Sequence, residues 1–265
     1  MQASIRPSGR PDVRYLLRLG DTCLILAQRL SEWCGHAPVL EEDIALANMA
    51  LDLIGQARGV LSRAAALDGQ GFDEDGLAFL RDEHDYLNPT IVELPNGVDG
   101  RERPGDFAFT VVRNALVSTW MKAWWERLRA SRDAELAAIA GKAAKEVRYH
   151  QQHAADWVVR LGDGTTGSRD RCVAALRRLW PYTAELFEDD AVDEAARAAG
   201  LGPVASELQA PWRADVDAIL REATLEAPAP SAFRSGGRAG RHSEHMGYVL
   251  AEMQVLQRAY PGGAW

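Results

Sequence analysis

The chain has 265 residues, of which 47% are hydrophobic and 26% are charged, and its formal net charge is -8. A chain of this length and apolar content can bury one substantial core, so we expect a single domain over residues 1–265. The negative charge argues against nucleic acid and against an anionic membrane surface as partners. The polar N-terminal segment and the absence of an uninterrupted apolar run of about 20 residues indicate a cytoplasmic protein.

Helical periodicity dominates the first half of the chain. Apolar residues recur at helical spacing from Tyr15 to Cys34, and a Gly-His-Ala-Pro break follows. Acidic residues then open a second predicted helix, residues 41–67, where the helix dipole favours negative charge. A shorter helix is expected over residues 75–86, and the proline- and glycine-rich stretch 89–104 is expected to be a loop.

The second half of the chain is also predicted to be helical. Its apolar periodicity indicates five helices, at residues 111–128, 139–161, 171–187, 206–224 and 243–260. Pro181 should kink the third of these, and Ser206 with Gln209 forms a capping-box pattern at the start of the fourth. Since no segment alternates as a strand does, the predicted fold class is all-α.

The chain has three cysteines, and two of them lie on the first predicted helix. Cys23 and Cys34 would be about 16 Å apart at the usual rise, which is too far for a disulfide. We interpret them as small buried hydrophobic residues in a reducing compartment.

A polar stripe interrupts the apolar second helix. Asn48, Asp52 and Gln56 are spaced four residues apart and so share one face. The stripe is either the solvated edge of the helix or a set of side chains facing the middle of a bundle. In the second case Asp52 needs a charged or hydrogen-bonding partner, for which Arg18 and Arg58 are candidates.

The helix at residues 139–161 places a histidine in its apolar seam. His150 follows the seam spacing, and Glu146 lies one turn before it on nearly the same face. Di-iron carboxylate proteins of this kind use two Glu-x-x-His pairs, but no histidine here has a Glu three positions earlier. Asp52 is followed by Gly55 and Gln56, so a second ligand pair is also missing. The sequence therefore predicts no metal site.

Other catalytic motifs are absent from the sequence. The His-x-x-His pairs at positions 150 and 153 and at 242 and 245 lack two further zinc ligands, so we interpret them as structural. No Gly-x-Ser-x-Gly motif, phosphate loop or dinucleotide fingerprint is present. We predict no catalytic residue in this chain.

Five segments carry a family resemblance that covers almost the whole chain: LRLGD at 17–21, SEWCGHAP at 31–38, LANMALDLIGQAR at 46–58, KEVRYH at 145–150 and EMQVLQR at 252–258. In this order they resemble the family of structural C subunits from the bacterial multicomponent phenylacetyl-CoA epoxidases, which are ring-hydroxylating monooxygenases. The resemblance implies a ferritin-like four-helix bundle with additional C-terminal helices.

The same resemblance implies a division of labour in the epoxidase complex. The chain would be a structural component that holds no cofactor and pairs with a related catalytic subunit, which carries a di-iron centre and epoxidises phenylacetyl-CoA. A reductase subunit with NADPH, flavin and iron–sulfur groups would supply electrons. The alternative from a different class is a self-sufficient ferritin-like metalloprotein, either a di-iron oxygenase or an iron-storage protein, which iron analysis would distinguish.

The resemblance also maps the ligand positions of the catalytic relative onto this chain. The matching positions are Asp21, Asp52 with Gly55, Ser118, and Glu146 with Tyr149. We expect these positions and the neighbouring His150 to be vestigial and not to bind metal. Gly55 and Tyr149 stand where the catalytic relative has imidazoles. This departure agrees with the absence of Glu-x-x-His.

Two segments are candidates for contact with the coenzyme A part of the substrate. The first is the stretch before Pro89, formed by Asp85, Tyr86, Leu87 and Asn88. Its alternative interpretation is a plain helix stop before proline.

The second candidate is the basic group Arg234, Arg238 and Arg241 on a glycine-rich connector. The 8 tryptophans are many for one bundle to cover, so an apolar partner interface is expected. Trp124, Trp125 and Trp265 are its candidate anchors.

Overall fold

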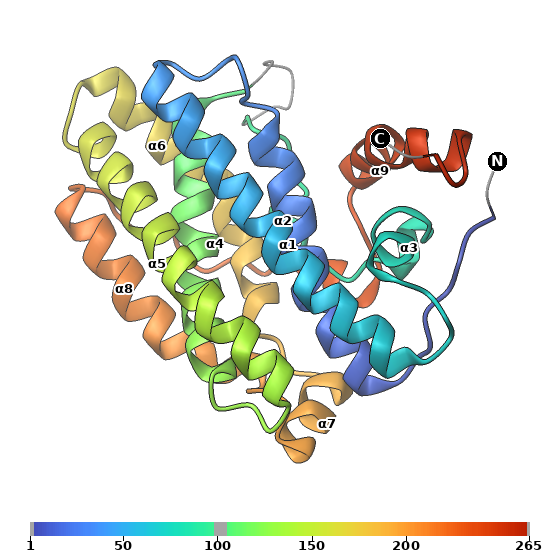
Figure 1. Ribbon diagram of the computed structural model, residues 1–265. Coiled ribbons are helices and arrows are strands. Elements are labelled where there is room, and N and C mark those ends of the chain that lie inside the picture. Colours follow the sequence, from blue (N-terminus) through green and yellow to red (C-terminus); the bar gives the residue numbers. More distant parts are fainter. Residues whose placement is uncertain (1–2, 98–104, 264–265) are drawn as a thin grey trace.

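The computed structural model describes residues 3–97 and 105–263, and it is built from helices (Figure 1). The α-helices in this part of the chain are α1 (Pro11–Ser31), α2 (Leu40–Asp68), α3 (Glu74–Phe79), α4 (Phe107–Leu128), α5 (Ala134–Gly162), α6 (Thr166–Leu179), α7 (Ala191–Ala199), α8 (Gln209–Glu222) and α9 (Glu244–Ala259). The described residues also contain two isolated β-bridges but no strand. The all-α prediction is confirmed.

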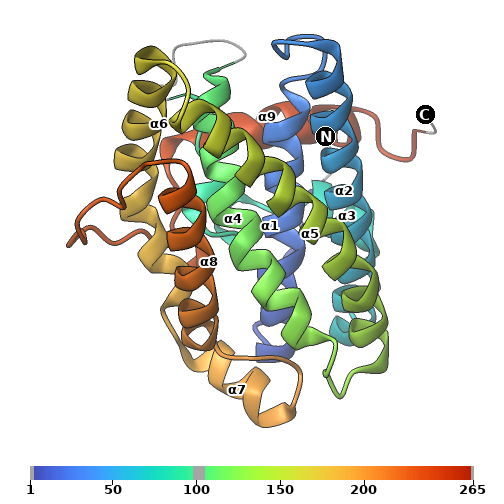
Figure 2. The ribbon, with the colours of Figure 1, turned by 90° about the vertical axis from the view of Figure 1, so that its left-hand side faces the viewer.

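The four longest helices form a bundle of two antiparallel hairpins, α1 with α2 and α4 with α5 (Figures 1 and 2). Trp124 Nε1 on α4 donates a hydrogen bond to Tyr15 Oη on α1 at 2.8 Å, which ties the two hairpins together. A Cβ atom at Gly20 would come within 2.7 Å of Leu61 Cδ2, so glycine allows α1 and α2 to approach closely. This arrangement is the ferritin-like bundle expected from the sequence.

Local signals fix the ends of the bundle helices. Asp106 caps α4 by accepting a hydrogen bond from Ala108 N at 2.8 Å, and Asp133 caps α5 by accepting one from Leu136 N at 3.0 Å. Gly69 ends α2 with φ +68, the left-handed conformation that favours glycine.

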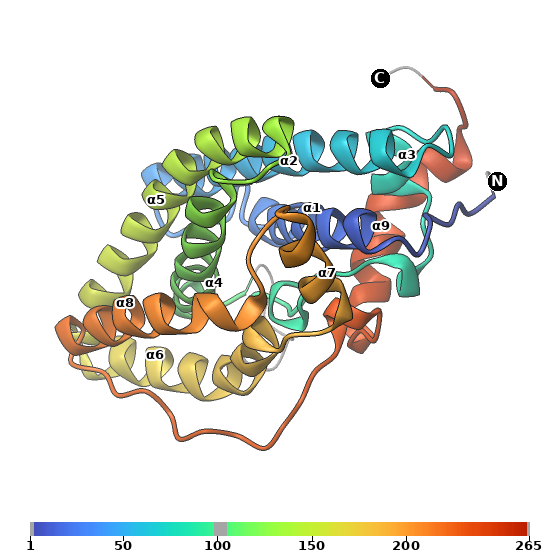
Figure 3. The same ribbon diagram turned by 90° about the horizontal axis from the view of Figure 1, so that it is seen from below.

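The later helices surround the bundle on two sides. α6 and α8 lie along the α4–α5 hairpin, whereas α9 lies beyond α1 and contacts α3 (Figures 2 and 3). A long connector runs from α8 around the outside of the molecule to α9 (Figure 3). These are the additional C-terminal helices of the prediction.

Two predicted helices end earlier than expected. α3 ends at Phe79, and a separate 3-10 turn, Glu83–Asp85, follows. The Arg81 side chain donates from Nε to Leu77 O at 2.5 Å, so it takes the acceptor that a continuing helix would use. α6 likewise ends at Leu179, and residues 180–187 form a 3-10 helix because Pro181 has no N–H for an α-helical bond.

Helix α7 was not predicted from the sequence. Asp190 caps this helix by accepting a hydrogen bond from Val192 N at 2.9 Å, and Gly200 ends it with φ +70. The predicted capping box at Ser206 is wrong, since Ser206 Oγ donates to Asp189 Oδ2 at 2.5 Å and α8 begins only at Gln209.

One helix in the described part of the chain, α2, is long and apolar enough to cross a membrane by length and composition alone. Its most apolar window is 44% buried inside the molecule. Packing in the bundle covers part of this apolar surface, and the rest is exposed.

Candidate functional site

The carboxylate of Asp21 lies in the middle of α1 and is fully buried. Arg81 forms a buried ion pair with it, in which Nη1 donates to Asp21 Oδ2 at 3.0 Å. The backbone N–H of Leu87 donates to the same oxygen at 2.8 Å. Burial acts to lower the pKa of Arg81, but the charge of Asp21 outweighs it and the pKa is raised. Asp21 is therefore neutralised by a guanidinium from its own chain.

A second polar pair joins α2 to α5. His150 Nε2 lies 3.0 Å from Asp52 Oδ2, with the imidazole buried and the carboxylate side chain 38% exposed. Burial lowers the pKa of His150, and the hydrogen bond to Asp52 only partly opposes this effect. The neutral imidazole is consequently the favoured form.

A third polar group lies one turn further along the same helices. Gln56 Nε2 donates to Glu146 Oε2 at 3.0 Å, and Cys23 Sγ lies 3.7 Å from Gln56 Oε1. Lys142 Nζ lies 3.4 Å from the other oxygen of Glu146. Glu146 thus bonds to Gln56 and Lys142, whereas His150, one turn further along α5, faces Asp52.

The polar stripe of α2 runs from the surface into the bundle. Asn48 is exposed, Asp52 is half-buried and Gln56 is buried. The two candidate arginine partners of Asp52 are wrong, because His150 fills that role. Arg58 instead pairs with Glu74 at the surface, and Arg18 belongs to a separate network.

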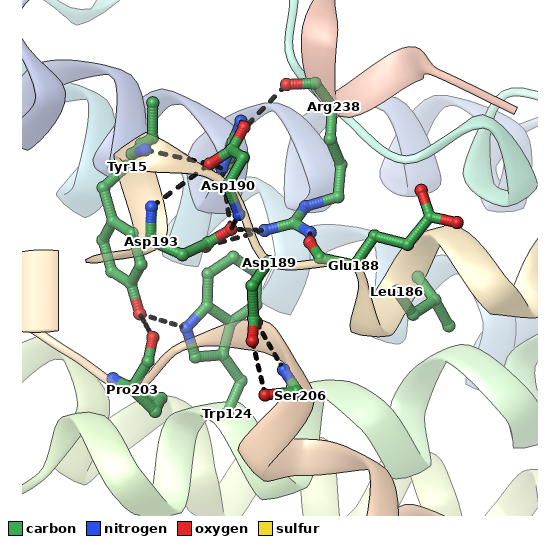
Figure 4. Close-up of polar contacts among 12 residues, drawn as sticks. Tyr15, Trp124, Leu186, Glu188, Asp189, Asp190, Asp193, Pro203, Ser206 and Arg238 are labelled. Atoms are coloured by element: carbon green, nitrogen blue, oxygen red, sulfur yellow. Dashed lines mark hydrogen bonds and ion pairs between the residues drawn. The ribbon is translucent and has the colours of Figure 1, made fainter. Parts of the chain in front are cut away.

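That network pins α7 to α1 and to the connector (Figure 4). Arg18 pairs with Asp190 and Asp193, and Arg238 Nη2 donates to Asp193 Oδ1 at 2.8 Å. Burial raises the pKa of Asp193 and acts the same way on Asp190, but at Asp190 the contact with Arg18 outweighs burial and lowers the pKa. Arg238 is buried with Asp193, so the predicted basic group on the connector does not exist as a single surface cluster.

The positions that match the ligands of the catalytic relative do not converge on one point. Gly55 and Tyr149 are exposed, and Ser118 is buried with its hydroxyl donating to the backbone oxygen of Asn114. In residues 3–97 and 105–263, no group of three or more His, Cys, Asp or Glu side chains is placed to hold a metal ion. The donor atoms present do not fit a di-iron centre, because Asp21, with the other inward groups, already has protein partners.

The segment proposed for coenzyme A lies directly against Asp21. Tyr86, Leu87 and Asn88 are buried, whereas Asp85 is half-buried. Tyr86 Oη donates to a backbone oxygen of α3 at 2.6 Å and accepts from Gln254 Nε2 at 2.8 Å. The structure thereby brings together Gln254 of the EMQVLQR segment, residues 252–258, and this stretch.

A buried histidine connects the same segment to the start of α9. His242 Nδ1 lies 2.7 Å from Glu93 Oε2, and its Nε2 lies 2.9 Å from Tyr86 O. Burial acts to lower the pKa of His242, but the contact with Glu93 outweighs it and the pKa is raised. Both ring nitrogens face acceptors, so the protonated imidazolium satisfies both contacts.

The histidine pairs behave differently from zinc ligands. His153 Nε2 lies 2.8 Å from Glu42 Oε2, while His150 faces Asp52. His245 lies 3.9 Å from Glu244, away from the contacts of His242. Each member of a pair thus has its own acidic or carbonyl neighbour.

Two expectations about exposed residues are wrong. Trp124 and Trp125 are fully buried and fill the core, so they are not interface anchors, and Trp265 lies outside the described residues.

Cys34 is exposed rather than buried, while Cys23 and Cys172 are buried free thiols. The exposed apolar surface lies elsewhere.

Some exposed apolar side chains lie on α9, and a second set follows the outer side of α2. Its large apolar side chains recur at helical spacing, and Tyr149 on the neighbouring α5 adds an aromatic ring that is 53% exposed. We call this set the α2 face, formed by Leu40, Ile44, Leu51, Ile54 and Tyr149. Exposed apolar side chains gathered on one helix are typical of a surface that a partner covers.

Comparison with known proteins places these features in a family. A family model described as "Phenylacetic acid catabolic protein" matches residues 2–265. The chain belongs to this family. It is similar to the C subunit of the 1,2-phenylacetyl-CoA epoxidase of Escherichia coli (strain K12), with 51% identity over 251 residues, which cover 95% of this chain and 98% of the relative. The family assignment confirms the resemblance found in the sequence.

The sequence analysis of this member of the phenylacetic acid catabolic protein family did not identify Arg81 as the partner of Asp21. It holds Asp21 from a position far along the chain, and its ring partner is Tyr86, whose centroid lies 4.2 Å from Arg81 Cζ. No local pattern around Arg81 indicates this contact. The available indication is the position of Asp21 inside the apolar helix α1, where a buried carboxylate needs a cation from elsewhere in the chain.

Proposed function

We propose that this chain is a structural, non-catalytic subunit of a phenylacetyl-CoA epoxidase in aerobic phenylacetate degradation, paired with a di-iron catalytic subunit. The observation that carries the proposal is the buried ion pair between Asp21 and Arg81, at a position where the resemblance implies a metal ligand. The 51% identity to an epoxidase component, over 95% of this chain and 98% of the relative, supports this assignment.

The chemistry of the bundle centre supports an inactive role. A carboxylate that binds iron must offer free oxygen atoms, but those of Asp21 accept from Arg81 and from a backbone N–H. Asp52 and Glu146 have their own partners on the opposite helix. In the proposal, the iron and oxygen chemistry belongs to the catalytic partner, and electrons come from a reductase with NADPH, flavin and iron–sulfur groups.

The α2 face is the proposed docking surface for the catalytic subunit. Leu51 is 64% exposed and Leu40 is 72% exposed, which leaves much apolar area in water in the isolated chain. Burial of such area contributes about 25 cal/mol per Å² to association before the costs of binding are counted. A related helical subunit would cover this face by helix-on-helix packing.

The thioester contact at residues 85–88 is a narrower proposal. Three of the four side chains are buried, and Asp85 has 17% of its side chain exposed beside Arg6. Its carboxylate could accept a hydrogen bond from an amide N–H of the pantetheine arm. Asp85→Asn should therefore raise the KM for phenylacetyl-CoA several-fold in the assembled complex, while Asp82→Asn, which is more exposed, should not. An unaltered KM would remove the segment from the substrate site.

Iron analysis tests the inactive role. The chain and its catalytic partner are each purified from iron-supplemented cultures, and iron is measured per chain by atomic absorption. The partner serves as the positive control. We expect iron in the partner and a folded, iron-free chain here, whereas about two irons per chain would support a self-sufficient metalloprotein instead.

A further inference from the structure

A cleft of about 560 Å³ opens between the 3-10 helix Trp180–Phe187, the first turn of α8 and the connector. Its volume lies in the range of sites that hold small molecules. In Figure 3 the connector and α8 lie on the opposite side of the molecule from α2. The cleft is thus separate from both the bundle centre and the α2 face.

The floor of the cleft is aromatic and held in place. Trp212 packs against Phe187 and Trp180, with ring centroids 5.0 and 5.7 Å away. Its indole Nε1 donates to Leu116 O at 2.9 Å, which fixes the ring against α4. Because these rings are already buried and oriented, a planar ligand can pack on their edges without ordering them first.

The rim of the cleft carries guanidinium groups. Arg213 Cζ lies 5.5 Å from the ring centroid of Trp180, and its side chain is 50% exposed. Arg234, on the connector, also lines the cleft and is 57% exposed. Both guanidiniums therefore stand at the mouth of an aromatic cleft, in a protein whose net charge is -8.

Each rim arginine has one acidic neighbour that a ligand can replace. Arg213 pairs with Asp217 at 2.8 Å, and Arg234 pairs with Glu188 at 2.9 Å. Such exposed pairs contribute only about 0–1 kcal/mol, so they compete weakly with other anions. The planar fork of arginine binds phosphate through two parallel hydrogen bonds. A phosphate group also carries more negative charge than the single exposed carboxylate that it would replace.

We propose that this cleft binds a ligand that joins a planar aromatic base to phosphate groups, the chemistry of a nucleotide. The base packs against the edges of Trp180 and Phe187, and the phosphates bind Arg213 and Arg234. Two sources share this chemistry, a free nucleotide and the nucleotide end of a coenzyme A thioester. The inference rests on the residues of the cleft and does not depend on the proposed function.

Calorimetric titration of the full-length chain tests the proposal with four probes: ADP, coenzyme A, adenosine and pyrophosphate. We expect saturable binding of ADP and coenzyme A, with adenosine and pyrophosphate each at least tenfold weaker because each lacks half of the ligand. Coenzyme A binding tenfold tighter than ADP would assign the site to a thioester, and equal affinities would assign it to a free nucleotide. Either result supports the proposal.

Substitution of the rim arginines completes the test. The double change Arg213→Gln and Arg234→Gln should weaken binding of ADP at least tenfold. Arg129→Gln is the matched control, since that side chain is also 57% exposed and paired with one glutamate, and it should alter affinity less than twofold. Circular dichroism verifies that each variant is folded.

Three results would overturn the proposal. They are the absence of saturable ADP binding, pyrophosphate binding as tight as that of ADP, and ADP affinity that the double substitution leaves unchanged.

Discussion

The bundle centre and the α2 face lie on two sides of the same helix. They differ in whether their side chains have partners within the chain. In the centre, the carboxylates of Asp21, Asp52 and Glu146 all have partners on other elements of this chain. On the α2 face, Leu51 and its neighbours are left in water. Helix α2 contributes to both regions, with its inward side satisfied and its outward side uncovered.

This difference indicates where the function of the chain lies. A buried site that uses metal keeps donor atoms unpaired for the ligand, whereas here the carboxylates of Asp21, Asp52 and Glu146 each have a partner within the chain. The uncovered apolar residues are instead typical of a surface that a partner covers. The interior therefore maintains the fold, and the surface is suited to assembly.

The largest expected effect comes from breaking the central ion pair. Arg81→Met leaves the buried carboxylate of Asp21 without its cation, which should lower the free energy of unfolding by about 3–5 kcal/mol. Urea denaturation measures the change. Arg58→Met is the control, because its pair with Glu74 is exposed and its loss should alter stability by about 0.5 kcal/mol or less.

A double variant sharpens this result. When Asp21→Leu accompanies Arg81→Met, the unpaired charge disappears, so part of the lost stability should return. A single Arg81→Met variant that loses less than about 1 kcal/mol would show that the interior does not depend on this pair.

The next largest effect concerns the α2 face. Leu51→Glu places a charge at the centre of the proposed interface and should weaken binding to the catalytic subunit by about 2 kcal/mol, or roughly thirtyfold. The stability of the isolated chain should change little, because the side chain is 64% exposed. Surface plasmon resonance with the immobilised partner gives the affinity.

Val255→Glu provides the comparison for that measurement. Val255 lies on α9 and is 55% exposed, so it matches Leu51 in character but lies outside the α2 face. Its substitution should leave the affinity unchanged. Equal loss of binding from both substitutions would argue against the α2 face as the specific docking surface.

A pH dependence should distinguish the two kinds of buried histidine. Burial acts to lower the pKa of His242, but Glu93 outweighs it, so the folded state binds the proton more tightly than the unfolded state. The stability from His242 is therefore fully present below the unfolded pKa of about 6.5 and is lost as pH rises through the folded value.

The pKa of His150 is lowered by burial, so the pH dependence of its contribution to stability has the opposite sign. This contribution is present above the unfolded pKa of about 6.5 and is lost as pH falls below it. Denaturation curves between about pH 6.5 and 8 isolate His242, because the buried thiols of Cys23 and Cys172, whose pKa is raised by burial, contribute only at higher pH. The wild-type chain should lose stability there as pH rises, and His242→Gln should lose less. Parallel pH slopes for the two proteins would show that the contact between His242 and Glu93 does not hold the extra proton.

The smallest expected effect is that of metal removal. Because the inward carboxylates have protein partners, prolonged treatment with a chelator should shift the Tm by no more than about 1 °C. Differential scanning calorimetry before and after dialysis against the chelator gives the comparison. A decrease of several degrees would mean that a bound metal stabilises the fold.

The sequence predicted the parts of the fold that depend on local signals. The apolar periodicity placed the four bundle helices. Helix α7 was also within reach, because Asp190, Asp193 and Gly200 form start and stop signals that the apolar count of this short helix obscured.

The polar contacts depend on residues far apart in the chain, which single-sequence patterns do not connect. Arg81 reaches Asp21, and Arg238 reaches Asp193, only after the helices have packed. The tryptophan expectation was wrong for the same reason, since composition does not reveal that Trp124 and Trp125 pack inside the molecule.

Turnover of phenylacetyl-CoA by separated and recombined subunits tests the structural role of this chain most directly. This chain, the catalytic subunit and their equimolar mixture are each assayed with reductase and NADPH, and product is measured by chromatography. We expect no product from this chain alone, little from the catalytic subunit alone, and full activity from the mixture, which should elute as one complex in size-exclusion chromatography with light scattering. Turnover by this chain without its partner, or a mixture that forms no complex, would contradict a structural role.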